Sequence, residues 1–97
     1  MFVLELSYAA PLGRVDALMK DHDGWLDRQY AAGVFIASGR ENPRDGGVIL
    51  AVGEDRAEIE RLAATDPFAV HGVCVYRITE FLATRTSDAL APHRQQV

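Results

Sequence analysis

The chain has 97 residues, of which 48% are hydrophobic and 25% are charged, and its formal net charge is -4. These fractions are typical of one soluble globular domain and exclude a disordered or low-complexity chain. Acidic residues outnumber basic ones by 14 to 10 without a basic cluster, so we expect no nucleic-acid and no membrane partner. A single cysteine excludes an internal disulfide. The first residues lack the basic region of a signal peptide, and we therefore expect a cytoplasmic protein.

Four segments have the patterns of β-strands. Residues 2–8 alternate between two sets of side chains, one of them apolar, which is the period of a half-buried strand. A wholly apolar or alternating pattern recurs in three later segments: residues 34–38, 48–52 and 73–81. We expect the first strand to end before Pro11, because proline interrupts strand pairing.

The first helix is predicted over residues 12–30, where apolar side chains recur at helical spacing. Gly33 follows as a C-terminal cap. Gly24 lies inside this helix and costs roughly 1 kcal/mol relative to alanine. We therefore expect residues 21–24 to be a weak and bent stretch.

The second helix is predicted over residues 54–65. Glu54 and Asp55 open it, and their negative charges suit the positive end of the helix dipole. Residues 84–97 are polar and predict a loose C-terminal tail. The folded domain is thus expected to comprise residues 1–83.

The order strand, helix, strand, strand, helix, strand predicts the α+β ferredoxin-like fold, βαββαβ. In that fold two helices cover one face of a four-stranded antiparallel sheet. Residues 48–52 are apolar on both sides, so the face turned away from the helices also exposes aliphatic side chains. Such a patch marks an interface, and the simplest cover is a second copy packed sheet against sheet as a homodimer.

His22 is the first candidate functional residue. It lies four residues after Leu18 and four before Leu26, on the apolar stripe of the first helix, so its ring is expected to point inward. Histidine exchanges protons near neutral pH, which is the requirement for general acid or base catalysis. The spacing alone favours a core or boundary histidine held by one hydrogen bond.

Asp66 is the second candidate. A carboxylate within hydrogen-bonding reach of an imidazole fixes its tautomer and increases its basicity. The structural alternative is an N-cap, because Asp66 directly precedes Pro67, and proline is favoured at the first helical position. Taken alone, Asp66 favours the capping interpretation.

The remaining candidates are suited to binding. Ser38 and Arg40 lie at the end of a strand, where a serine can donate a hydrogen bond to a substrate oxygen and an arginine can hold a carboxylate or phenolate. The alternative is a turn with a solvated arginine. Trp25 and Phe68 are candidates for a pocket wall, although aromatic residues at helical spacing more often belong to the core. No convincing set of metal ligands is present, and we expect no metal.

Four motifs together resemble those of the YciI-like, or YCII-related, family of dimeric α+β barrel proteins, over roughly residues 1–81. They are, in chain order, Asp21-His22-Asp23-Gly24-Trp25-Leu26, then Gly33-Val34-Phe35-Ile36-Ala37-Ser38-Gly39, then Gly46-Gly47-Val48-Ile49-Leu50-Ala51, and finally Asp66-Pro67-Phe68 followed by Gly72-Val73. The family is similar in fold to muconolactone isomerases and chlorinated-hydroquinone dehydrochlorinases. Arg40 departs from its pattern, because many relatives have proline there.

The resemblance implies a His–Asp pair in a pocket, with these roles on His22 and Asp66 and with Ser38 beside the pocket. It favours a small cofactor-independent enzyme that isomerises, or eliminates a group from, a small anionic organic molecule. Arg40 favours an anionic ligand. Two alternatives remain: a non-catalytic module that binds a small metabolite through the same pocket, and a purely structural dimer. The structural dimer predicts that His22 and Asp66 lie far apart.

Overall fold

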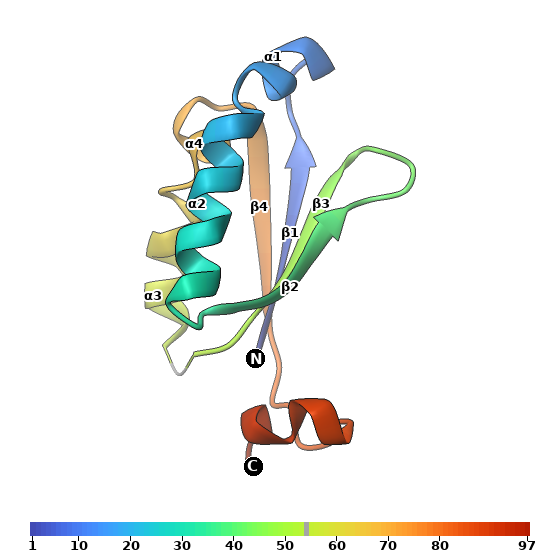
Figure 1. Ribbon diagram of the computed structural model, residues 1–97, viewed down its shortest axis with the longest axis vertical. Helices are drawn as coiled ribbons and strands as arrows, with labels where there is room; N and C mark the ends of the chain where they lie inside the picture. Colours follow the sequence, from blue (N-terminus) through green and yellow to red (C-terminus); the bar gives the residue numbers. More distant parts are fainter. Residues whose placement is uncertain (54) are drawn as a thin grey trace.

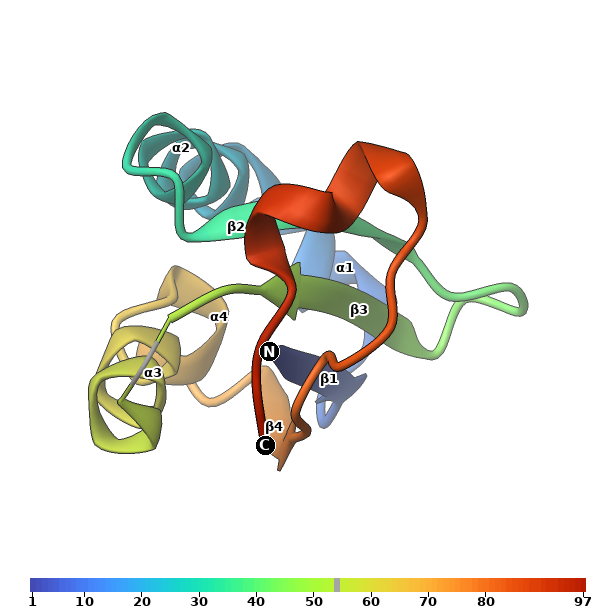
Figure 2. The same cartoon turned by 90° about the horizontal axis from the view of Figure 1, so that it is seen from below.

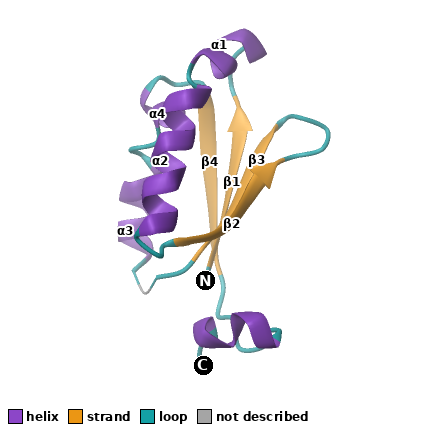
Figure 3. Ribbon diagram, viewed as in Figure 1, coloured by secondary structure: helices purple, strands orange, loops and turns teal. Residues whose placement is uncertain are grey.

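A four-stranded antiparallel sheet with helices on one face organises the chain (Figures 1 and 3). The computed structural model describes residues 1–53 and 55–97. Its strands are β1 (Phe2–Tyr8), β2 (Phe35–Arg40), β3 (Gly46–Ala51) and β4 (Cys74–Glu80). They are arranged in the order β2-β3-β1-β4, and every neighbouring pair is antiparallel. This is the ferredoxin-like α+β fold that the sequence predicts.

The helices connect the strands and cover one face of the sheet (Figure 1). They are α1 (Leu12–Ala17), α2 (Met19–Ala31), α3 (Arg56–Ala63) and α4 (Pro67–Val70). A 3-10 helix, η1 (Asp88–His93), follows the last strand and lies beyond the end of the sheet (Figure 1). The long helix α2 and the α3–α4 segment lie side by side on the sheet (Figures 1 and 2). Among the described residues, no helix combines the length and apolar character that crossing a bilayer requires.

Strand β1 supplies the centre of the core. Leu4 is fully buried and lies opposite Ile49 of β3 and Ile78 of β4, so their side chains share the face that the helices cover. Leu6 occupies the same face one pleat further along, opposite Gly47. This confirms the alternation predicted for the first strand. The inward positions of β1 and its neighbours therefore define which side chains can reach the space beneath α2.

The predicted single first helix is interrupted. Leu18 separates α1 from α2 with φ of -103° and ψ of 0°. Its amide bonds to the carbonyl of Val15, three residues back, which tightens the last turn of α1 and redirects the chain. Gly24, in the stretch predicted to be weak, lies within continuous α2, so the helix is not interrupted there. Gly33, with φ of +75°, follows α2 as predicted.

Strand β2 contains Ser38 as predicted and continues through Gly39 and Arg40, two residues beyond the predicted end of the strand. The reason is pairing with β3, which continues to Arg40 opposite Gly47. A bulge near the start of the strand shifts the register between Phe35 and Ala37. Ser38 and Arg40 consequently face the same side as the core.

Helix α3 begins at Arg56. The Asp55 side chain accepts a hydrogen bond from the amide of Ala57 at 2.9 Å, so Asp55 caps the helix. Glu54, predicted to open this helix, lies outside the described residues.

The C-terminal segment is ordered, which corrects the prediction of a loose tail. After β4 the chain forms η1 and returns to the N-terminus, below the sheet in Figure 1. The Oε1 atom of Gln95 accepts hydrogen bonds from the ammonium of Met1 at 2.7 Å and from the amide of Ala83 at 3.0 Å. These hydrogen bonds give the N-terminal ammonium and a backbone amide their acceptor. The polar side chain of Gln95 therefore connects the C-terminal segment to the N-terminus.

Candidate functional site

His22 lies in the first turns of α2 and is 7% exposed. Its Nδ1 atom is 2.8 Å from Oδ1 of Asp66, although the two residues are 44 positions apart in the sequence. The structure therefore confirms that His22 points inward and that the His22–Asp66 pair exists. It contradicts the prediction of the purely structural dimer, in which the two groups lie far apart.

Asp66 is fully buried between α3 and α4. The same Oδ1 atom that faces His22 accepts a hydrogen bond from the amide of Phe68 at 2.9 Å, and Pro67 occupies the first helical position of α4. Asp66 is thus both the predicted N-cap and the partner of the imidazole. Capping sets the direction of the carboxylate, because the amide donor of Phe68 fixes Oδ1 at the start of the short helix.

Tyr76 completes this arrangement and was not among the residues singled out from the sequence. Its hydroxyl donates a hydrogen bond of 2.5 Å to Oδ2 of Asp66. Tyr76 lies opposite Leu6 of β1, on the inward face of β4. The alternation of Cys74, Tyr76 and Ile78 could have identified it as inward-facing. Burial, followed by the negative charge of Asp66, raises the pKa of the Tyr76 hydroxyl well above its ordinary value of 10.0.

This raised pKa predicts a loss of stability at alkaline pH. The folded chain holds the Tyr76 proton more tightly than the unfolded chain, so the stabilisation is fully present below pH 10.0 and is lost as the pH rises beyond it. Denaturant unfolding measured between pH 8 and 12 is expected to show a falling free energy of unfolding from about pH 10 upwards. The Tyr76→Phe variant has no such proton, and its decline is expected to be shallower. An equally steep decline in both proteins would contradict the prediction.

Two aromatic rings stack against the imidazole of His22. The ring of Phe68 is parallel to that of His22, with an interplanar angle of 6° and centroids 4.0 Å apart. Trp25 stacks more obliquely at 5.9 Å and 28°. These contacts, together with the Asp66 hydrogen bond, restrict the ring of His22 to one orientation. Because Nδ1 is hydrogen-bonded to Asp66, Nε2 is the ring nitrogen that remains available to a bound molecule.

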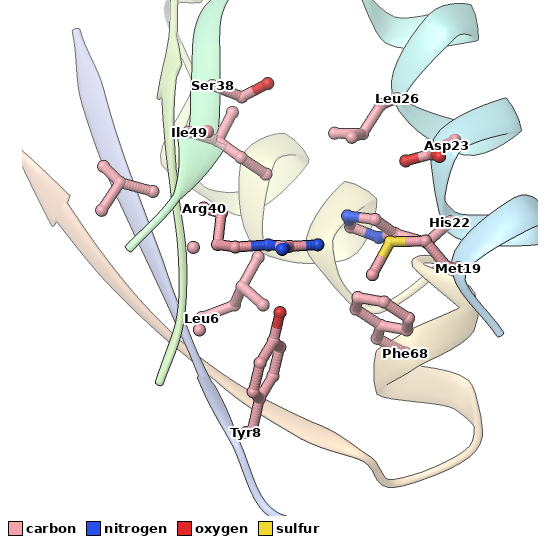
Figure 4. A pocket seen from close by; sticks show the side chains of 14 residues that line it. Leu6, Tyr8, Met19, His22, Asp23, Leu26, Ser38, Arg40, Ile49 and Phe68 are labelled. Atoms are coloured by element: carbon pink, nitrogen blue, oxygen red, sulfur yellow. The ribbon is translucent and has the colours of Figure 1, made fainter. Parts of the chain in front are cut away.

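That space is a cavity of about 280 Å³ between α2, α4 and the sheet (Figure 4). Its polar lining comes from Tyr8, His22, Asp23, Ser38 and Arg40. The rest of the wall is made by aliphatic residues, Phe68 and glycines of β2 and β3: Leu6, Met19, Leu26, Gly39, Gly46, Gly47, Val48, Ile49 and Phe68. In Figure 4 the guanidinium of Arg40 and the hydroxyl of Tyr8 point into the cavity in front of His22.

Three of the four residues predicted to bind a ligand line this cavity: Ser38, Arg40 and Phe68. The hydroxyl of Ser38 is also hydrogen-bonded to that of Tyr30, at 2.6 Å. Trp25 is different, because it is not among the described residues that line the cavity. The geometry therefore places Trp25 in the core behind His22, not on the predicted pocket wall.

Trp25 has two partners in that core position. Its Nε1 donates to the hydroxyl of Thr65 at 2.9 Å. Its ring meets that of Phe35 edge to face, with centroids 5.3 Å apart. A buried indole needs such a hydrogen-bond acceptor, and Thr65 supplies it from the turn that precedes Asp66. Trp25 thus packs against the imidazole of His22, and its hydrogen bond to Thr65 connects α2 to that turn.

Tyr8 and Asp23 line the cavity and were missed in the sequence. Tyr8 ends the inward stripe of β1, and this position was the signal for it. Its ring meets that of Phe68 edge to face at 6.4 Å, and the guanidinium of Arg44 lies 5.6 Å from its centroid. Asp23 directly follows His22 in α2. Helical periodicity gives such a neighbouring position no inward direction, so the pattern did not indicate that Asp23 lines the cavity.

The loop between β2 and β3 is tied to α1 near the cavity. The guanidinium of Arg44 donates a hydrogen bond to the carboxylate of Asp16 at 2.5 Å. This hydrogen bond lowers the pKa of Asp16 and raises that of Arg44. Both side chains are accessible to solvent, so the pair orders the loop more than it stabilises the fold.

Cys74 does not take part in this site. It is a buried free thiol in β4, and burial raises its pKa to about 12. The thiolate form, which is the nucleophile, is therefore not available at neutral pH. Within residues 1–53 and 55–97, no three His, Cys, Asp or Glu side chains gather as metal ligands would.

Comparison with known proteins places the chain in a family. The sequence model of the YCII-related domain matches residues 1–82. The chain belongs to the YCII-related family. No curated protein matches the sequence significantly.

The YCII-related domain also resembles a solved structure. This is 5-chloro-2-hydroxyhydroquinone dehydrochlorinase (TftG) from Burkholderia phenoliruptrix AC1100, in complex with 2,5-dihydroxybenzoquinone. The TM-score is 0.65 and the sequence identity 17%, and the match covers 84% of this chain and 93% of the other. At this identity the likeness establishes the shared fold, which agrees with the strand order observed here.

Proposed function

We propose that this YCII-related domain is a small cofactor-independent enzyme. In this proposal His22 and Asp66 perform acid–base chemistry on a small anionic organic molecule held in the cavity. The observation that carries the proposal is the pairing of a fully buried carboxylate with one nitrogen of an imidazole whose other side lines a cavity. A carboxylate–imidazole pair of this kind is the usual arrangement for moving a proton at a histidine.

The hydrogen bond to Asp66 determines which nitrogen reacts. Asp66 accepts at Nδ1, so the neutral imidazole carries its proton there and has its lone pair on Nε2. Nε2 removes a proton from a bound molecule, and the resulting imidazolium is stabilised by the carboxylate. The same proton can then be returned to another atom of the substrate, which gives isomerisation. If a leaving group departs with its bonding electrons, the result is elimination.

The cavity is suited to an anion. Arg40 brings the one cationic side chain found among the described residues that line it, and the hydroxyl of Tyr8 points into the same space (Figure 4). A guanidinium and a phenol together stabilise the negative oxygen that forms when a proton is lost beside a carbonyl. Apolar walls from Leu6, Leu26 and Phe68 accommodate a ring or short carbon skeleton.

The similar dehydrochlorinase supports a cyclic, oxygen-rich substrate. Its structure holds 2,5-dihydroxybenzoquinone, a small planar ring that carries acidic hydroxyl groups. A ring of that kind has both the anionic oxygen that Arg40 can bind and the apolar faces that the wall of the cavity can contact. We therefore infer that hydroxylated quinones and hydroquinones are the first compounds to test.

Replacing His22 tests the mechanism directly. The wild-type chain is expected to release chloride from 5-chloro-2-hydroxyhydroquinone, and the His22→Ala variant to release it at least about 100-fold more slowly, because the acid–base group is gone. Chloride release is followed with an ion-selective electrode. His71→Ala is the matched control, because His71 caps the C-terminus of α4 and is not among the lining residues. Equal rates for wild type and His22→Ala would contradict the proposed mechanism.

A binding module without catalysis gives a different result in the same experiment. That protein would bind 2,5-dihydroxybenzoquinone in a calorimetric titration, and His22→Ala would weaken binding, yet no chloride would be released by the wild type. The buried Asp66 favours the enzyme, since simple binding does not require a carboxylate behind the imidazole.

We also propose that the protein is a homodimer that pairs the open faces of two sheets. Val48 and Val75 point away from the helices and are 37% and 63% exposed. Phe81 and Leu82 follow β4 and are 41% and 50% exposed. A second copy would remove this apolar surface from water. Sedimentation equilibrium is expected to give twice the chain mass, and a monomer at micromolar concentration would contradict the proposal.

A further inference from the structure

The carboxylate of Asp66 is held at both of its oxygens. Oδ1 lies 2.8 Å from Nδ1 of His22 and accepts from the amide of Phe68 at 2.9 Å, whereas Oδ2 accepts from the hydroxyl of Tyr76 at 2.5 Å. We propose that Tyr76 is a positioning residue, whose hydroxyl locks the rotation of the Asp66 carboxylate so that Oδ1 stays directed at the imidazole. The inference deepens the proposed function and rests on it for its catalytic meaning.

The lock follows from the geometry of a carboxylate. Its two oxygens are chemically equivalent and exchange places when the group rotates about the bond to Cβ. The donors at Oδ1, on His22 and Phe68, restrain one side of the plane, and a donor at Oδ2 restrains the other. With both sides restrained, rotation requires the loss of hydrogen bonds to a buried charged group, which are among the more costly ones to break.

The three residues come from different parts of the fold. His22 lies on α2, Asp66 between α3 and α4, and Tyr76 on β4. Strand β4 is paired with β1 along its full length, so Tyr76 presents its hydroxyl from a rigid sheet. Its bond to Asp66 therefore sets the position of the α3–α4 turn relative to the sheet, and through it the position of the imidazole on α2.

Tyr76 acts through Asp66 and not on a ligand. Tyr76 is not among the described residues that line the cavity. Its hydroxyl donates to Oδ2 of Asp66, and no other described residue donates a hydrogen bond to that oxygen. Because burial keeps this hydroxyl protonated, it remains a donor throughout the neutral range. If Tyr76 only filled space in the core, removing its hydroxyl would leave the hydrogen bond between His22 and Asp66 unchanged.

The test measures the His22 Nδ1–H proton by NMR of the full chain labelled with ¹⁵N-histidine. The wild type is expected to show one downfield, slowly exchanging Nδ1–H signal, assigned by its loss in His22→Gln. In Tyr76→Phe, the exchange of this proton with water is expected to be about tenfold faster. Tyr30→Phe is the matched control, because it removes a hydroxyl bonded to Ser38 instead, and its exchange rate is expected to equal that of the wild type.

A second measurement does not depend on the folding of Tyr76→Phe. Tyr8 and Tyr30 are replaced by phenylalanine, which leaves Tyr76 as the only one of the 3 tyrosines. Incorporating 3-fluorotyrosine then makes the Tyr76 hydroxyl a stronger donor and draws charge from Asp66. The His22 Nδ1–H signal is expected to move upfield relative to the unfluorinated protein.

Two results would overturn the inference. One is an Nδ1–H exchange rate in folded Tyr76→Phe within twofold of the wild type, and the other is a signal that does not move on fluorination. Neither depends on turnover, so they are separate from a failure of the proposed function, which is an absence of chloride release by the wild type. Where turnover is measurable, Tyr76→Phe is expected to reduce kcat and to leave KM nearly unchanged.

Discussion

Replacing Asp66 with alanine is expected to lower the free energy of unfolding by about 3 to 5 kcal/mol. The carboxylate is fully buried, and its removal leaves the donors of His22, Phe68 and Tyr76 without their acceptor. It also removes the N-cap of α4. Small domains have total stabilities of about 5 to 15 kcal/mol, so this single change can remove much of the margin. Urea unfolding followed by circular dichroism measures the loss.

The Asp66→Asn variant is the matched control. Asparagine has the same shape, and its oxygen can still accept from Phe68, so α4 keeps its cap. The amide nitrogen then faces Tyr76, whose hydroxyl can accept as well as donate. We expect a smaller loss of stability, about 1 to 2 kcal/mol, because a charged acceptor is replaced by a neutral one. If Asn and Ala were equally destabilising, the charge and not the hydrogen-bonding shape would be the main contribution of Asp66.

Replacing Gly46 with alanine is expected to destabilise the fold by about 3 kcal/mol or more. An added Cβ would lie 1.8 Å from the carbonyl oxygen and 2.9 Å from the carbonyl carbon of Leu6. Both atoms belong to the backbone of β1, so no side-chain rotation can relieve the contact. The space can open only if β3 moves away from β1, and Gly46 is paired with Ser7 of that strand. The same movement would distort the cavity, which Leu6 and Gly46 line together.

Gly13→Ala provides the comparison for Gly46→Ala. A Cβ at Gly13 would meet no atom within 4 Å, and the residue lies within helix α1. Because alanine favours the helix over glycine by about 1 kcal/mol, this variant is expected to be as stable as the wild type or more so. Thermal unfolding of the two variants side by side gives the difference. Equal melting temperatures would show that β1 and β3 tolerate the extra methyl group.

The sequence predicted the orientation of His22 and the capping role of Asp66 separately, but not the contact between them. The spacing of Leu18, His22 and Leu26 indicates that the imidazole points inward, because a helix repeats its faces every three to four residues. Asp66 before Pro67 indicates a cap, and the structure has that cap. The contact between His22 and Asp66 spans 44 positions, so no local pattern could establish it, and the family resemblance supplied that step.

The binding residues were harder to assign. The predicted strand ends at Ser38 because Gly39 follows it, yet pairing with β3 extends β2 to Arg40. Trp25 and Phe68 are both aromatic and both adjacent to His22, but Trp25 lies in the core and Phe68 at the cavity. Periodicity does not distinguish them, because the cavity is formed by residues of several elements that only the tertiary structure brings together.

By itself, the sequence determined the order of the four strands and of the two helical segments between them, the inward faces of β1 and α2, and the resemblance to the family. These features depend on neighbours a few residues apart, and such spacings can be read along the chain. Only the tertiary structure decided that Tyr76 meets Asp66, that Arg40 and Tyr8 open into one cavity, and that the C-terminal segment binds the N-terminus. Each of these contacts joins elements brought together by packing, and distances between packed elements are set by the whole fold.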